Sequence, residues 1–145
     1  MDVLGHSMKP VVMPSYPHMM AEDTDVWTRY LKDPITPIRE VWYDVHVGRP
    51  VSLPVGADAL TRRVAAGVTR KRIDVVCRVG GGFWVVEVKP FANMLALGQV
   101  ISYYRLLVTE YELDGAAWPV VVCGDYDRDL ADEYEAQMVG LIQVD

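Results

Sequence analysis

The sequence predicts a single α/β domain in which a mixed sheet is flanked by helices. Three segments, 41–47, 72–79 and 83–89, alternate apolar and polar residues with the period of a β-strand. Residues 96–111 instead carry apolar side chains at helical spacing. About half of the 145 residues are apolar, which is enough for one hydrophobic core. We expect this domain to span residues 21–145.

Residues 1–20 are expected to form an extended arm rich in proline and methionine. Prolines at positions 10, 14 and 17 exclude a helix. The methionines at 8, 13, 19 and 20 would pack either on this chain or on a partner. The first helix is predicted to begin at residue 21, because acidic residues 22–25 precede an apolar stripe, and to end at Asp33-Pro34.

Three strands are predicted next. Residues 49–61 hold two further prolines and are expected to form a loop or an irregular edge, and the glycines at 80–82 predict a hairpin turn between the second and third strands. Alternation predicts two apolar faces, one on the first strand and one on the second: Val41, Tyr43, Val45 and Val47; Ile73, Val75, Cys77 and Val79. The helix at 96–111 follows, and then a buried strand at 118–123, an acidic helix at 127–137 and a final strand at 140–144.

Composition excludes several protein classes. No apolar run approaches the roughly 20 residues that cross a bilayer. The start of the chain lacks the basic and apolar segments of a signal peptide, so we expect an intracellular protein. Cys77 and Cys123 each lie in an apolar run and are expected to be buried thiols.

Charged residues interrupt the second and third predicted strands. Glu87 and Lys89 share one face of the third strand, and the glycine turn would bring Asp74 opposite or diagonal to Glu87. Two neighbouring carboxylates in a sheet need compensation, which a divalent cation provides. Two carboxylates, a backbone carbonyl and waters suit Mg²⁺ or Mn²⁺, and Lys89 could position or deprotonate a water or stabilise charge on a phosphoryl group. The alternative is a cross-strand salt-bridge cluster on a solvated face.

Gln99 and Tyr103 lie four residues apart on the next predicted helix. They therefore share one face of it, beside the apolar stripe. Because a short connection joins this helix to the third strand, we expect both side chains near Lys89, where they would hold a phosphate, a nucleotide or a water. The alternative is that both are ordinary surface residues.

Taken together, Asp74, Glu87-Val88-Lys89 and Gln99-x-x-x-Tyr103 resemble the PD-(D/E)XK nuclease superfamily, and the Gln/Tyr element is similar to its RecB-like branch. The predicted helix, three strands, helix and strand match the restriction-endonuclease-like core of that superfamily. The resemblance implies that Asp74 and Glu87 bind the metal, that Lys89 is the catalytic lysine, and that Gln99 and Tyr103 support substrate or water. The sequence also resembles uncharacterised bacteriophage proteins.

Two departures from the superfamily pattern stand out. Ile73 occupies the position of the proline that gives the signature its name. Many members carry a glutamate on the first helix, and Glu22 and Asp25 are the nearest candidates here, although both also suit the helix dipole. Without that residue, one metal ion is a safer expectation than two.

The net charge of −6 is unevenly distributed. Seven acids and one base lie in residues 125–145, whereas residues 1–124 balance. A basic segment precedes Asp74 and is interpreted as a clamp for a nucleic-acid backbone or, alternatively, as a solvated helix or loop. Its members are Arg62, Arg63, Arg70, Lys71 and Arg72.

The sequence thus favours a Mg²⁺-dependent deoxyribonuclease with DNA as its partner. One rival is a structural or assembly protein, such as a virion component, that uses the nuclease fold as a scaffold and binds other virion proteins through residues 1–20 and the acidic C-terminal segment. A third interpretation is a nucleic-acid-binding module that has lost turnover.

Overall fold

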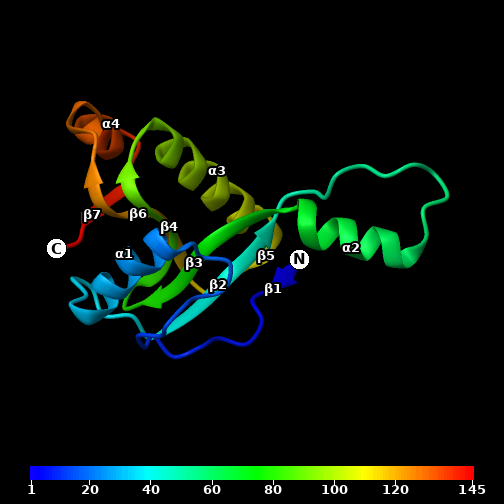
Figure 1. The fold of residues 1–145 in the computed structure, drawn as a ribbon, viewed down its shortest axis with the longest axis horizontal. Helices are drawn as coiled ribbons and strands as arrows, with labels where there is room; N and C mark the ends of the chain where they lie inside the picture. Colours follow the sequence, from blue (N-terminus) through cyan, green and yellow to red (C-terminus); the bar gives the residue numbers. More distant parts are fainter.

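The computed structural model describes residues 1–145 and has the α/β architecture that the sequence predicts (Figure 1). A five-stranded mixed sheet has the order β2-β3-β4-β6-β7. The neighbours β2/β3 and β3/β4 are antiparallel, whereas β4/β6 and β6/β7 are parallel. The strands are β2 (Glu40–Val47), β3 (Lys71–Val79), β4 (Gly82–Ala92), β6 (Ala116–Tyr126) and β7 (Gly140–Gln143).

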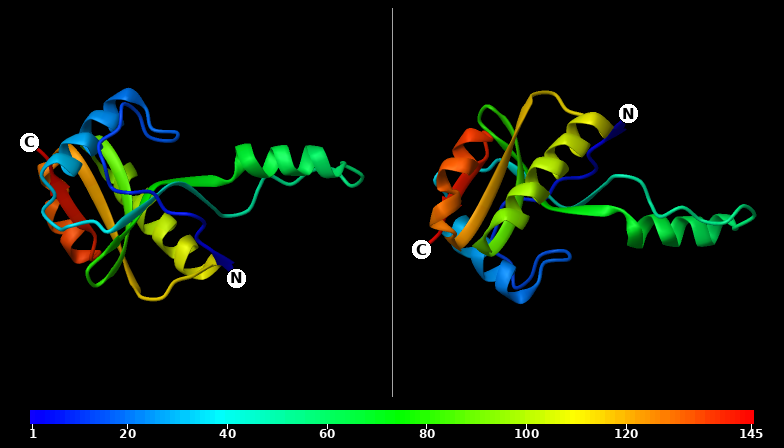
Figure 2. Two further views of the ribbon diagram at one scale, coloured as in Figure 1. Left: turned by 90° about the horizontal axis from the view of Figure 1, so that it is seen from below. Right: turned by 90° about the horizontal axis from the view of Figure 1, so that it is seen from above.

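Two helices cover the two faces of this sheet (Figure 2). Helix α1 (Ala21–Lys32) buries Val26, Trp27 and Tyr30 against one face. Helix α3 (Met94–Glu110) packs on the other, where Leu107 and Val100 are fully buried. A 3₁₀ turn (Arg128–Leu130) and helix α4 (Ala131–Ala136) lie beside the N-terminal end of α3. The expected acidic helix is therefore present in shortened form.

The predicted hairpin is confirmed. Val79 pairs with Gly82 across a two-residue turn. Gly82 has φ of 151°, and a Cβ there would lie 2.2 Å from the Ala116 carbonyl oxygen, so only glycine fits. Cys77 and Cys123 are both buried free thiols, as expected.

The alternation predicted for β2 and β3 is wrong beyond Asp44. Val41 and Tyr43 pack in the core under α1, but Val45 and Val47 pack with Leu107 of α3. Ile73, opposite Val45, likewise leaves the cluster that holds Val75, Cys77 and Val79. Asp44 has φ of 52°, and this break in extended backbone changes which core the following residues enter.

Helix α2 (Ala59–Thr69) begins within the segment 49–61 that the sequence predicts as a loop or irregular edge, and it continues into the basic segment, for which a solvated helix or loop is the alternative to a clamp. The Asp58 carboxylate caps it by accepting from the Thr61 N–H at 2.7 Å. None of its residues is buried. It projects from the end of the β2–β3 ribbon, well clear of the sheet (Figures 1 and 2).

Residues 1–20 follow the edge of the sheet as an extended arm. Strand β1 (Asp2–Val3) pairs in parallel with β5 (Tyr111–Glu112). Met8 and Val41 exchange two backbone hydrogen bonds at 2.8 and 3.0 Å. Tyr16 is buried, with its ring tilted against that of Tyr43 at 5.3 Å. The arm therefore packs on this chain. No helix is long and apolar enough to span a membrane.

Candidate active site

The candidate site lies where strands β3 and β4 separate. The last paired residues of these two strands are Val75 and Val86. The next residue is Asp74 on β3 and Glu87 on β4. Beyond that point β3 continues with β2 and β4 continues with β6, so the sheet forks (Figure 1). The Asp74 Oδ2 atom accepts a hydrogen bond from the Val88 N–H at 3.0 Å, which fixes this carboxylate at the fork.

Glu87 is the one buried polar or charged residue of the chain, with 3% of its surface exposed. It points away from the α1 core, because its neighbours Val86 and Val88 both enter that core. The Lys89 Nζ atom lies 3.7 Å from Glu87 Oε2. The predicted trio of Asp74, Glu87 and Lys89 therefore comes together in the structure.

Burial dominates the electrostatics of the two carboxyls. It raises the pKa of Asp74 to about 6, against the opposing effects of the Val88 N–H and the Lys89 charge. Burial also raises the pKa of Glu87 to about 8, and the neighbouring Asp74 charge raises it further than Lys89 lowers it. Lys89 alone therefore does not neutralise the pair, and a second cation would be favoured there.

Asp23 of α1 is close enough to the candidate site for its charge to act there, and the sequence analysis did not single it out. Burial raises the pKa of Asp23, while the charge of Lys89 lowers it, and Asp23 in turn raises the pKa of both Asp74 and Glu87. The expected Asp25 instead pairs with Arg29 at 3.1 Å. Helical spacing could have indicated Asp23, because it precedes the buried Val26 by three residues and so lies on the same face of α1.

Tyr103 of α3 is close enough to the two carboxylates for their charges to act on it. Burial raises the pKa of Tyr103, and the charges of Glu87 and Asp74 raise it further. Gln99 lies one turn earlier on α3, and its Oε1 atom is buried without a hydrogen-bond partner. An unpartnered buried amide oxygen is costly, so Gln99 has an acceptor available for a ligand or a water.

Asp44 joins the site from β2. Its Oδ2 atom lies 3.2 Å from His18 Nε2 and 3.4 Å from His46 Nε2, and its Oδ1 atom lies 3.7 Å from Arg72 Nε. Its charge also contributes to the raised pKa of Asp74. Asp44 and His46 of β2 are therefore part of a larger charged cluster that also includes His18 of the N-terminal arm.

The structure does not bring the predicted basic clamp together. Arg62 donates to the carbonyls of Pro54 and Ala57, and Arg70 donates to the Gly48 carbonyl and to Glu110. Arg72 is the member that contacts the Asp44 cluster. Arg63 on α2 and Lys71 at the start of β3 are exposed, and neither forms a salt bridge.

The donor set decides which metal the site could hold. No group of three His, Cys, Asp or Glu side chains is arranged to bind an ion. Asp74 and Glu87 supply two carboxylates, and Mg²⁺ commonly binds through one or two carboxylates while keeping several waters. The pair therefore fits Mg²⁺ or Mn²⁺, and it lacks the nitrogen and sulfur donors of a structural zinc site.

Comparison with known proteins gives no further assignment. No family model, no curated protein and no solved structure matches the chain.

Proposed function

We propose that this protein is a metal-dependent nuclease that hydrolyses DNA phosphodiester bonds, with a restriction-endonuclease-like core of the PD-(D/E)XK type. Asp74 and Glu87 hold Mg²⁺ or Mn²⁺, Lys89 serves the attacking water, and Gln99 and Tyr103 form the helical wall of the site.

The observation that carries this proposal is the pair of carboxyls at the sheet fork, Glu87 buried and Asp74 half-buried. Asp74 and Glu87 both have a raised pKa although Lys89 lies beside them. A cross-strand salt-bridge cluster on a solvated face would leave its acids exposed, whereas Glu87 is 3% exposed. Burial of this kind is typical of functional sites. Tyr103 adds support, because it approaches the same carboxyls from a different element.

The chemistry requires few groups. A water oxygen forms a bond to phosphorus and releases a proton to solvent, the bond from phosphorus to the sugar oxygen breaks, and that sugar oxygen takes up a proton from solvent. The bound metal would polarise the phosphate and the water. The Lys89 ammonium can donate a hydrogen bond to the water or to the phosphoryl oxygens as charge develops on them. Asp74 stays in place through its hydrogen bond from Val88.

The test compares wild-type protein with Glu87→Gln and Lys89→Met on linear, branched and single-stranded DNA, with Mg²⁺ or Mn²⁺. We expect cleavage by the wild type and a loss of roughly a thousandfold in each variant. Glu112→Gln and Lys32→Met alter the same residue types at exposed positions and should leave cleavage unchanged. Absence of cleavage by the wild type on every substrate would reject the enzyme proposal.

The second candidate function is that of a structural or assembly protein, for example in a virion. The unpartnered helix α2 favours it, because a helix with no buried residue suits attachment to another protein. Wild-type protein that binds no Mn²⁺ and cleaves no DNA, but enters an assembly, would support this candidate. DNA binding that survives Glu87→Gln, without cleavage by the wild type, would instead support a binding module.

A further inference from the structure

The projecting segment 48–70, called here the α2 arm, is a folded unit. Arg62 Nε donates to the Ala57 carbonyl at 3.1 Å, and the Val51 N–H donates to Thr69 Oγ1 at 2.8 Å. These bonds tie the loop before α2 to one side of the helix. Arg70 fixes the root of the arm, since its side chain donates to the carbonyls of Gly48 and His46. The α2 arm is therefore held in one conformation by its own hydrogen bonds.

The other side of α2 carries an apolar stripe that nothing in this chain covers. Leu60, Val64 and Val68 recur every four residues and are 62%, 56% and 68% exposed. Burial of side chains of this size in an interface is favourable. Residues 48–70 also hold four basic side chains and one acidic one. The arm thus presents an apolar stripe within a basic segment.

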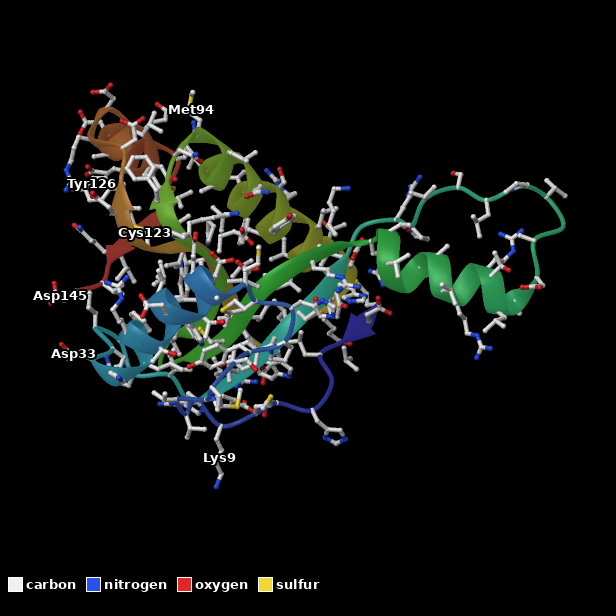
Figure 3. All side chains as sticks on the ribbon, viewed as in Figure 1. Lys9, Asp33, Met94, Cys123, Tyr126 and Asp145 are labelled. Carbon is white, nitrogen blue, oxygen red and sulfur yellow. The ribbon has the colours of Figure 1, made fainter.

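The opposite end of the molecule has the complementary character. Phe91, Met94 and Leu95 are exposed where β4 passes into α3. The β6 end lies beside them, because Phe91 pairs with Asp125 and the Asp127 N–H donates to the Ala92 carbonyl. Residues 125–145 carry seven acids and one base. Figure 3 labels Met94 and Tyr126 at this end, on the far side of the molecule from α2. We call this surface the acidic end.

From these two surfaces we propose that the α2 arm of one copy docks on the acidic end of a second copy, so that the chains associate head to tail. The apolar stripe would pack on Met94 and Leu95, with basic residues of the arm against Asp125, Asp127 and their acidic neighbours. Because the two surfaces lie at opposite ends, one copy cannot satisfy both by itself. Such an interface extends into a chain of copies or closes into a ring.

Charge and the exposed apolar stripe favour the acidic end of a second copy over other binding partners of the α2 arm. A symmetric arm-to-arm pair would bring two basic segments together, which costs energy at moderate salt. DNA would match the charge but would leave Leu60, Val64 and Val68 uncovered.

Mixing two interface-blocked variants tests the arrangement. Val64→Glu blocks the arm and Met94→Lys blocks the acidic end, and each alone is expected to be monomeric by sedimentation velocity at concentrations where the wild type associates. Their mixture should form one-to-one dimers and nothing larger, because each variant keeps one intact surface. Each substitution should weaken association at least tenfold, and added salt should weaken association of the wild type.

A matched control is Ile35→Glu, which alters an exposed apolar residue outside both surfaces and should leave association unchanged. Circular dichroism checks that each variant is folded, and Leu60→Glu and Leu95→Lys replace any variant that is not. A wild type that is monomeric at every concentration would overturn the proposal. So would a mixture that does not dimerise, or association that Met94→Lys leaves intact.

Discussion

The sheet fork and the α2 arm depart from the usual distribution of side chains in opposite directions. At the fork, Asp74 and Glu87 are acids enclosed by protein, and burial raises the pKa of each. On α2, Leu60, Val64 and Val68 are apolar residues left in water. Each arrangement costs stability in the isolated chain, through desolvation of charge in one case and unburied apolar surface in the other. A bound cation would offset the cost of the desolvated charge, and a bound protein surface would offset the cost of the exposed apolar side chains.

The largest expected effect separates a core helix from the arm helix. Leu107→Ala in α3 should lower the free energy of unfolding by about 3 kcal/mol, because it leaves a cavity under the sheet. Leu60→Ala in α2 should change it by less than about 0.5 kcal/mol, since Leu60 packs on nothing in the monomer. Urea unfolding at a protein concentration that keeps the chain monomeric measures both. A comparable loss for Leu60→Ala would show that the arm packs on the body.

The second prediction concerns the cost of the buried glutamate. The pKa of Glu87 is raised from an ordinary 4.5 to about 8, so the unfolded chain releases this proton first as the pH rises. The free energy of unfolding should therefore fall between about pH 4.5 and pH 8. Glu87→Gln should remove that loss and stabilise the protein at pH 9 by on the order of 3 kcal/mol.

Thermal or urea unfolding across this pH range provides the measurement, with Glu112→Gln as an exposed control. Mg²⁺ should stabilise the wild type at pH 9 and have little effect on Glu87→Gln, because the cation needs the ionised pair. A wild-type stability that is flat between pH 5 and pH 9 would contradict the assigned burial of Glu87.

The smallest expected effect is local. An isolated helix of 11 residues is marginal in water, and α2 depends on its own cap and on the loop beside it. Asp58→Ala removes the acceptor of the Thr61 N–H and should reduce hydrogen-exchange protection within α2 several-fold. Protection in β3 and β4 should stay unchanged. Equal loss of protection in the sheet would mean that the arm and body unfold as one unit.

Sequence patterns predicted the elements that pack on the sheet and missed those that do not. The hairpin, α1 and α3 were predicted because burial imposes a period on their apolar residues. Helix α2 lacks a buried face, and the prolines at 50 and 54 just before it favoured a loop. The change of face at Asp44 was unpredictable from alternation, because it depends on one residue with positive φ.

For the site, spacing along the chain identified Asp74, Glu87, Lys89 and Tyr103 as neighbours. Asp23 was missed because acids in the first turn of a helix have a ready explanation in the helix dipole. The contacts of His18 could not be read from the sequence at all. His18 approaches Asp44 only because the N-terminal arm packs along β2. Packing of this kind leaves no periodic pattern in the sequence.

The N-terminal arm, residues 1–20, also affects which surfaces of two copies of this protein can bind each other. An outer strand with free N–H and C=O groups is a template for strand addition from another molecule, and it is a frequent origin of aggregation. Here Met8 occupies both backbone groups of Val41, and the opposite outer strand, β7, is only four residues long. The backbone available for intermolecular strand pairing is thus reduced at both borders of the sheet. Copies should therefore recognise one another through side chains, whose charge and shape can specify a partner, rather than through a backbone that any sequence provides.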